Sequence, residues 1–163
     1  MSKKSAKQEK NKGSFTPTMV NKKARFNFHL LDKLEAGITL VGTEVKSVRQ
    51  ANVSLDEAFC RFREGELFLI GCTIAVYEHG NIMNHDPNRP RKLLLHKREL
   101  YKLEVQIRQK GLTVVPTRMY FSRGRAKVEI ALARGKTHGD KRAKLKDRQI
   151  DQDLRRAAAR RLR

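Results

Sequence analysis

Short runs of alternating apolar and polar residues dominate the first half of the chain. Phe26–Leu30 alternates with a period of two, as the residues of a half-buried strand do. Ala36 and Gly37 interrupt the pattern, and a longer extended stretch is predicted from Ile38 to Val48. Gly42 lies inside that stretch and predicts a bulge or a sharp bend.

A hairpin follows in the middle of the chain. Strands are predicted at 59–63 and 66–70, with Glu64-Gly65 as the turn between them. A further strand is predicted at 73–77. It leads to a polar loop at 79–90, whose glycine and prolines favour the protein surface.

Two longer apolar runs lie in the second half of the chain, at 112–121 and 125–134. Ser122-Arg123-Gly124 is the predicted turn between them. Pro116 inside the first run predicts an edge position or a bulge, because proline cannot donate a hydrogen bond to a neighbouring strand.

Helical spacing is confined to short segments. Ser54–Glu57 has the form of a capping box and predicts the start of a short helix. Leucines and an isoleucine recur on one face over 96–110, and Gly111 is placed to end that helix. Several short strands with one interrupting helix predict a mainly β fold that closes into a small barrel. For so basic a chain, the oligonucleotide-binding (OB-fold) barrel with flanking helices is the natural candidate.

Both ends of the chain differ from its middle. Residues 1–20 are predicted to be a disordered basic arm, and 21–134 the barrel domain. Residues 135–163 form a basic tail in which Asp140 can cap a helix. The apolar stripe of this tail is thin, so an isolated helix there is marginal in water. We expect a conditionally helical tail that is disordered when free.

Positive charge is the strongest compositional signal. The chain holds 37 Lys and Arg against 17 Asp and Glu, a net charge of +20. Most of the excess lies in residues 1–25 and 134–163. Such an imbalance is typical of proteins that bind nucleic acid. Two alternatives are arms that only keep the protein soluble and a basic ribosomal protein, although the latter should localise its charge less.

Patterns for catalysis or metal binding are weak. Arg134–Thr137 contains the Gly-Lys-Thr ending of a phosphate-binding loop, but Ile130 occupies the position of its required glycine. His79, His85 and Asp86 share a loop but lack the spacing of a metal site. A nuclease would need clustered carboxylates or a metal. We therefore expect no enzyme activity, no cofactor and no metal.

Cysteine content and hydropathy bear on the compartment. Cys60 and Cys72 are too few for a disulfide framework or a four-ligand zinc site, and are expected to be core thiols. No apolar run follows the charged N-terminus as in a secretory signal, and none approaches the ~18 residues of a membrane span. We expect a cytoplasmic protein with no membrane partner.

Basic and apolar residues interleave at places that suit RNA. Asn21–Arg25 precedes the first predicted strand, and Arg89–Lys92 and His96–Arg98 flank Leu93–Leu95. Lys and Arg at such places contact phosphates, and an exposed leucine can pack against an unstacked base. The alternative for the leucines is plain core, which we expect for two of the three. Further basic contacts with RNA are predicted at Lys46, Arg91, Lys92 and Arg98.

Seven short motifs, taken in order, carry a resemblance to a known family. They are Asn21–Arg25, Glu35-Ala36-Gly37, Gly42–Ser47, Asp86-Pro87 with Arg89, Arg91–Leu95 with Arg98-Glu99-Leu100, Gly124–Val128, and Gly135-Lys136 with Asp140-Lys141-Arg142. From about Asn21 to about Arg148 the chain resembles the small protein B family, the SsrA-binding proteins of bacterial trans-translation.

This resemblance implies a function that composition alone does not give. Members of the family bind transfer-messenger RNA at its tRNA-like domain and deliver it, charged with alanine, to stalled ribosomes. Elongation factor Tu with GTP accompanies them. The tail of these proteins enters the empty decoding centre of the small subunit. The fold of the family is an OB-fold barrel, in agreement with the strand pattern.

Site residues implied by the resemblance fall into two groups. The contacts with the tRNA-like domain are Asn21, Lys22, Arg25, Glu35, Leu94 and Lys127. The tail residues that act in the decoding centre are Gly135, Lys136, His138, Asp140, Lys141 and Arg142. Family members usually carry an aromatic or imidazole ring immediately before the Asp-Lys-Arg triplet, where this chain has Gly139. We expect His138 to supply the missing ring.

Overall fold

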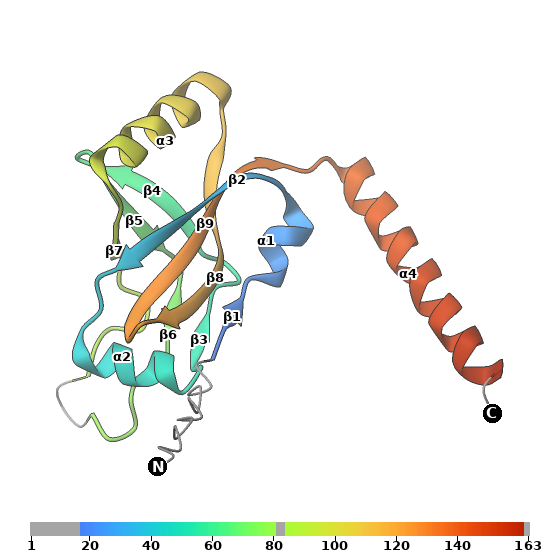
Figure 1. Cartoon of the computed structure of the whole chain (residues 1–163), viewed down its shortest axis with the longest axis horizontal. Coiled ribbons are helices and arrows are strands. Elements are labelled where there is room, and N and C mark those ends of the chain that lie inside the picture. Colours follow the sequence, from blue (N-terminus) through green and yellow to red (C-terminus); the bar gives the residue numbers. More distant parts are fainter. Residues whose placement is uncertain (1–16, 81–83, 162–163) are drawn as a thin grey trace, which may run out of the picture.

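Seven antiparallel strands form one sheet that closes into a barrel (Figure 1). The computed structural model describes residues 17–80 and 84–161, so the predicted N-terminal arm lies almost wholly outside the described residues. The strands are β1 (Met19–Val20), β2 (Phe28–Ile38), β4 (Phe59–Arg63), β5 (Glu66–Ile70), β7 (Arg91–Leu94), β8 (Thr113–Ser122) and β9 (Arg125–Gly135).

Barrel closure comes from β8 and β9, which pair with each other and with opposite edges of the remaining sheet. The strand order is β1-β8-β4-β5-β7-β2-β9, and the additional β8–β9 pairing closes the sheet. A closed sheet leaves few unpaired edges. A separate two-stranded sheet consists of β3 (Val53–Ser54) and β6 (Thr73–Ile74). The predicted mainly β barrel is confirmed.

The two hairpins lie where the sequence predicts them. The register of β4 and β5 places Arg63 opposite Glu66, with Gly65 at a positive φ of 75° in the turn. The register of β8 and β9 shifts between Pro116 and Arg118. The bulge predicted from Pro116 is therefore confirmed, and it lets a residue without an N–H lie inside a paired strand.

The region from 22 to 49 differs from its prediction. Phe26 belongs to a short helix, α1 (Lys22–Asn27), and the strand begins two residues later. The stretch expected to be extended up to Val48 instead forms α2 (Gly42–Arg49). Its buried residues share one helical face, and Glu44 accepts a hydrogen bond from the N–H of Val41 at 2.8 Å. Alternation of apolar residues did not distinguish this short helix from a strand.

The helix predicted from Ser54–Glu57 is wrong. Ser54 pairs with Thr73 in the small sheet, and the residues after it form a turn. The carbonyl of Leu55 accepts from the Asn21 amide at 2.6 Å. Long-range pairing therefore overrides the local capping pattern. The strand predicted at 73–77 is likewise confined to its first two residues, because its partner β3 is only two residues long.

Two further helices complete the chain. The first, α3 (Lys97–Lys110), has the extent that the sequence predicts and ends at Gly111, whose φ is 58°. Figure 1 shows α3 over one end of the barrel and α2 at the other end. The tail forms α4 (His138–Arg161), which runs away from the barrel. The expectation that the tail is disordered when free stays a prediction.

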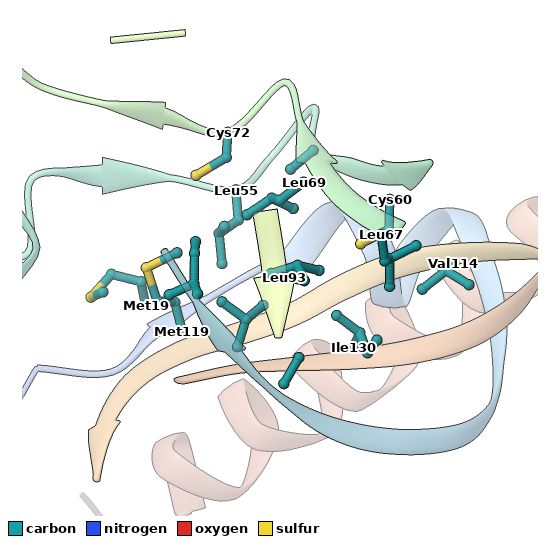
Figure 2. Close-up of a cluster of buried hydrophobic side chains, with 14 of the residues drawn as sticks. Met19, Leu55, Cys60, Leu67, Leu69, Cys72, Leu93, Val114, Met119 and Ile130 are labelled. Carbon is teal, nitrogen blue, oxygen red and sulfur yellow. The ribbon is translucent and has the colours of Figure 1, made fainter. Parts of the chain in front are cut away.

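The core fills the barrel with side chains from every long strand. Figure 2 shows Leu67, Leu93, Met119 and Ile130 among this buried cluster. Both cysteines are buried and free, as expected. Burial raises the pKa of the Cys72 thiol to about 11, and it also raises the pKa of Cys60. Neither thiol is therefore a thiolate near neutral pH.

Candidate nucleic-acid interface

A buried ion cluster holds α2 against the start of β7. Glu44 is fully buried and accepts from Arg91 Nε at 2.8 Å and from Arg89 Nε and Nη2 at 2.8 and 2.6 Å. Arg91 also donates to the carbonyls of Cys72 and Pro87, at 2.7 and 2.9 Å. Each charge thus has a partner that compensates for its loss of water.

On the outer wall of the barrel, three polar side chains meet above β2, β8 and β9. Lys127 of β9 lies opposite Tyr120 of β8 and opposite Gly37 of β2. Glu35 precedes Gly37 by two residues in β2. Its carboxylate accepts hydrogen bonds from Lys127 Nζ at 2.8 Å and from the Tyr120 hydroxyl. We call Glu35, Tyr120 and Lys127 the carboxylate cluster.

Hydrogen bonding sets the ionisation of the carboxylate cluster. The hydrogen bonds from Lys127 and then Tyr120 hold the pKa of Glu35 below its usual range. The same contact with Glu35 raises the pKa of Tyr120 to about 12. At neutral pH the cluster therefore contains a carboxylate from Glu35 and a neutral phenol from Tyr120, beside Lys127. It can both donate to and accept from a polar ligand.

Beside this cluster the barrel wall is hollowed. Leu94 of β7 pairs with Gly37, so Lys127, Gly37 and Leu94 form a row across β9, β2 and β7. A Cβ on Gly37 would lie 3.2 Å from Leu94 Cβ, and its absence leaves space between the two longer side chains. The hollow has a volume of about 460 Å³ and its lining includes Phe121 and Arg125.

Leu94 is the residue of the leucine triplet that suits contact with a base. It is 51% exposed, whereas Leu93 is buried in the core and Leu95 packs against it. An apolar side chain held at the rim of a hollow, with a lysine across the gap, can pack against a flat ring while the charge meets a phosphate.

A second ion cluster borders the first on the same wall. Glu129 lies opposite both Glu35 and Arg118, and its carboxylate accepts from Arg118 Nε at 2.9 Å and from the Thr117 hydroxyl at 2.7 Å. Although burial opposes ionisation, these hydrogen bonds hold the pKa of Glu129 below its usual range. The guanidinium of Arg118 also lies 5.1 Å from the Tyr120 ring centre.

Two of the predicted RNA contacts lie in the interior instead. Asn21 is only 1% exposed; its side chain caps α1 by accepting from Ala24 N–H at 2.8 Å and donates to Leu55. Arg91 is 0% exposed and belongs to the ion cluster around Glu44. Both side chains hold the scaffold in this structure, and their predicted contact with RNA stays a prediction.

The other predicted basic contacts are spread around the barrel. Lys22 and Arg25 lie exposed on α1, and Lys46 lies exposed on α2, 5.0 Å from the Tyr77 ring centre. Lys92 pairs with Glu66 across β7 and β5. Arg98 lies on α3, over the end of the barrel away from α2. The structure thus brings together Glu35, Leu94 and Lys127, and leaves these five outside that group.

The predicted tail residues form the joint between β9 and α4. Gly135 ends β9, and Lys136 donates its N–H to the carbonyl of Asn27 at 2.9 Å and its Nζ to that of Arg25 at 3.1 Å. Asp140 accepts from the Thr137 N–H and hydroxyl at 3.1 and 2.8 Å, which caps the first turn of α4.

Charge at the joint follows from these contacts. The hydrogen bonds from Thr137 and from His29, whose Nε2 lies 3.4 Å away, hold the pKa of Asp140 below its usual range. Lys141 and Arg142 follow in the first turn of α4, where Arg142 is exposed and Lys141 half-buried. The side chain of His138 lies outside the described residues, so its expected role stays a prediction.

Sequence reasoning missed Tyr120 and Arg118 in this wall. Both alternate outward along β8, and β8 was predicted as a strand. The available signal was this outward alternation, but the register that sets Tyr120 against Lys127 is a property of the assembled barrel.

In the part of the chain that the structure describes, no three His, Cys, Asp or Glu side chains gather as a metal site. Nor does any helix in that part have the length and apolarity to cross a membrane.

Comparison with known proteins identifies the family. The family model described as SmpB protein matches residues 18–160. The chain belongs to the SmpB family. The SsrA-binding protein of Solidesulfovibrio magneticus is 52% identical over 141 residues, covering 86% of this chain and 92% of that relative. The SsrA-binding protein of Rhodopirellula baltica is 46% identical over 153 residues, covering 93% and 87%.

A solved structure extends the likeness to three dimensions. The structure named "tmRNA-SmpB: a journey to the center of the bacterial ribosome" has a TM-score of 0.63 and 51% identity, covering 75% of this chain and 86% of that chain. The barrel described above therefore has the fold of that structure. Its name gives SmpB together with an RNA, tmRNA, and with the bacterial ribosome.

Proposed function

We propose that this protein binds the tRNA-like domain of transfer-messenger RNA and brings that RNA to stalled ribosomes for trans-translation. The observation that carries the proposal is the side-by-side arrangement of the carboxylate cluster and the hollow at Leu94. The similar proteins support it by their names. The relatives are called SsrA-binding proteins, and the solved structure is named for tmRNA-SmpB and the bacterial ribosome.

The chemistry of the wall suits a folded RNA loop. Glu35 accepts from base amino groups or ribose hydroxyls, and Tyr120 and Lys127 hold its carboxylate in place for that purpose. Lys127 and Arg125 face phosphates, and Leu94 packs against an unstacked base. Contacts of this mixed kind read a shape and a few bases, whereas phosphate contacts alone give no selectivity.

The tail acts separately from the wall in this proposal. Lys136 seats the joint on the C-terminal carbonyls of α1, and Asp140 starts α4. Lys141 and Arg142 then meet ribosomal RNA in the decoding centre, with His138 as the ring that stacks there. Elongation factor Tu with GTP accompanies the alanyl-charged RNA. The protein acts in the cytoplasm as a binding factor and not as an enzyme.

The test measures the binding of transfer-messenger RNA and of an ordinary tRNA across a salt series. Lys127→Ala is expected to weaken binding to transfer-messenger RNA by about tenfold or more and to reduce selectivity over tRNA. The substitution removes both a cation that contacts a phosphate and a hydrogen-bond donor to Glu35. Arg61→Ala is the matched control, since Arg61 is an exposed cation of β4.

A second arm separates the wall from the tail. Replacing Asp140, Lys141 and Arg142 together by Ala should leave selective RNA binding intact but abolish tagging on stalled ribosomes. Equal affinity of the unmodified protein for both RNAs, collapsing as salt rises, would mean that binding is only phosphate neutralisation, and it would overturn the proposal.

A further inference from the structure

Arg118 of β8 lies on the same wall as the carboxylate cluster, and the proposed function gives it no role. Its Nε donates to Glu129 Oε2 at 2.9 Å, and its Nη2 lies 2.7 Å from the same oxygen. Its guanidinium also lies 5.1 Å from the Tyr120 ring centre. Two independent contacts therefore fix the orientation of a side chain that is still 45% exposed.

The acid that holds this arginine is more buried than the bases around it. The side chain of Glu129 is 13% exposed, whereas that of Lys33 is 50% exposed. Lys33 Nζ lies 3.6 Å from Glu129 Oε1, and the Thr117 hydroxyl donates to that oxygen at 2.7 Å. One carboxylate thus lies beneath two basic side chains, Lys33 and Arg118. The group therefore presents positive charge to the solvent.

The guanidinium of Arg118 keeps donors for a ligand. Arginine presents several N–H donors in a planar fork. Only Nε and Nη2 face Glu129, and in the part of the chain that the structure describes Nη1 meets no acceptor. A guanidinium that is oriented by an acid and has a free edge suits a phosphate, because arginine binds phosphate oxygens through two parallel N–H groups.

Along β8, Arg118 lies between two groups of predicted RNA contacts. On one side is α1, which carries two of these contacts and packs against the wall where Ala24 meets Val115. On the other side is Tyr120, two residues further along, which lies opposite Lys127. Diagonal neighbours in an antiparallel pair are about 7–8 Å apart between Cα atoms, and Arg118 and Lys127 are such neighbours. Arg118 therefore continues the wall from Lys127 toward α1.

We propose that Arg118 is a further RNA-binding residue of the wall, which holds a phosphate beside the one at Lys127, and that Glu129 is its positioning residue. The inference rests on the proposed function, because the occupant is the same transfer-messenger RNA. It extends the contact surface from the hollow at Leu94 toward α1. Glu129 orients the guanidinium and does not touch the RNA, whose phosphates repel a carboxylate.

The test measures the affinity of full-length variants for transfer-messenger RNA by fluorescence anisotropy across a salt series. Arg118→Ala should weaken binding by about tenfold and lower the salt slope by about one. Arg118→Lys keeps the charge and the salt slope but loses the planar fork, so it should still bind about fivefold more weakly than the unmodified protein. Arg61→Ala, which removes an exposed cation of β4, is the control for net charge.

Glu129→Gln separates positioning from simple neutralisation by the sign of its effect. The substitution removes a negative charge from the wall, so phosphate neutralisation alone predicts tighter binding. Loss of orientation at Arg118 predicts binding weaker by about threefold or more, although the protein has become more basic. Glu64→Gln is the matched control, because it changes the net charge equally at an exposed turn between β4 and β5.

Folding is checked by the thermal unfolding midpoint of each variant, and Arg118→Lys keeps the test decisive if Glu129→Gln is unstable. Equal affinity of Arg118→Lys and the unmodified protein would overturn the inference, and so would tighter binding by a folded Glu129→Gln. Either result leaves the proposed function standing as long as Lys127→Ala still weakens binding. If Lys127→Ala also binds normally, both proposals fail together.

Discussion

Removing the charge of Glu44 is the sharpest test of how the barrel is held together. This carboxylate is fully buried and carries four hydrogen bonds, from the N–H of Val41 and from two arginines. In Glu44→Gln, the guanidinium of Arg91 stays fully buried without a counter-charge. Breaking a buried ion pair from one side costs about 3–5 kcal/mol in unfolding free energy. That is a large share of the about 5–15 kcal/mol that stabilises an ordinary domain.

Urea unfolding followed by circular dichroism measures this cost. With a slope of about 2 kcal/mol per M, the midpoint should fall by about 1.5–2.5 M. Glu66→Gln is the matched control, because it removes a carboxylate from an ion pair whose two side chains are 45% and 41% exposed. An exposed pair contributes at most about 1 kcal/mol, so its midpoint should move by less than about 0.5 M.

The pH dependence of the same variant gives an independent check. Burial raises the pKa of Glu44, but hydrogen bonds from Arg89 and Val41 and the charge of Arg91 outweigh it, so the pKa lies below its ordinary 4.5. A lowered pKa stabilises the fold above pH 4.5, and this contribution is lost as the pH falls through the folded-state value. The stability gap between the unmodified protein and Glu44→Gln should therefore narrow below about pH 4.5. Equal midpoint shifts for Glu44→Gln and Glu66→Gln at pH 7 would refute the reasoning.

Three other outcomes follow from single contacts. Asp140→Ala should lower the helical content of the first turn of α4 in NMR chemical shifts, with Asp153→Ala as control, because Asp140 accepts from Thr137. In the unmodified protein, the same loss should develop as the pH falls below 3.8, since the pKa of Asp140 is lowered. Cys72 should resist a thiol reagent at pH 8 until urea unfolds the barrel, since a pKa of about 11 leaves about 0.1% thiolate. Gly71→Ala should cost more unfolding free energy than Gly124→Ala, about 2 kcal/mol or more against about 1. Both have positive φ, but a Cβ on Gly71 would lie 2.6 Å from the Glu57 carbonyl oxygen whereas Gly124 faces open space. Rapid labelling of the folded thiol, unchanged shifts in Asp140→Ala, or equal costs at the two glycines would each contradict the corresponding expectation.

How much of the fold is visible in the sequence depends on the range of the interactions involved. The hairpin at Glu64-Gly65, the bulge at Pro116 and the end of α3 at Gly111 follow from backbone rules within a few residues. By contrast, α2 depends on Glu44, whose arginine partners lie 45 and 47 residues away. The helix predicted from the capping pattern at Ser54 is wrong for the same reason, because Ser54 pairs with Thr73 of β6, which is distant in sequence.

The candidate site divides in a similar way. Family resemblance pointed to Glu35, Leu94 and Lys127, and the barrel brings these three to one wall. The resemblance pointed to Asn21 and the run of basic residues to Arg91, but neither signal shows that both side chains are buried and support the scaffold. Tyr120 was missed because only the β8–β9 register shows that it meets Lys127.

One strand joins the two working parts of the proposed function. Lys127 lies near the start of β9, and Gly135 ends the same strand at the joint to α4. At about 3.3 Å per residue, the eight steps between them span about 26 Å. Because β9 pairs with both β2 and β8, this distance is fixed by hydrogen bonds along nearly its whole length. In the proposed function the barrel is therefore a spacer of fixed length between the wall and the tail, and Lys136 and Asp140 hold the joint through exposed hydrogen bonds.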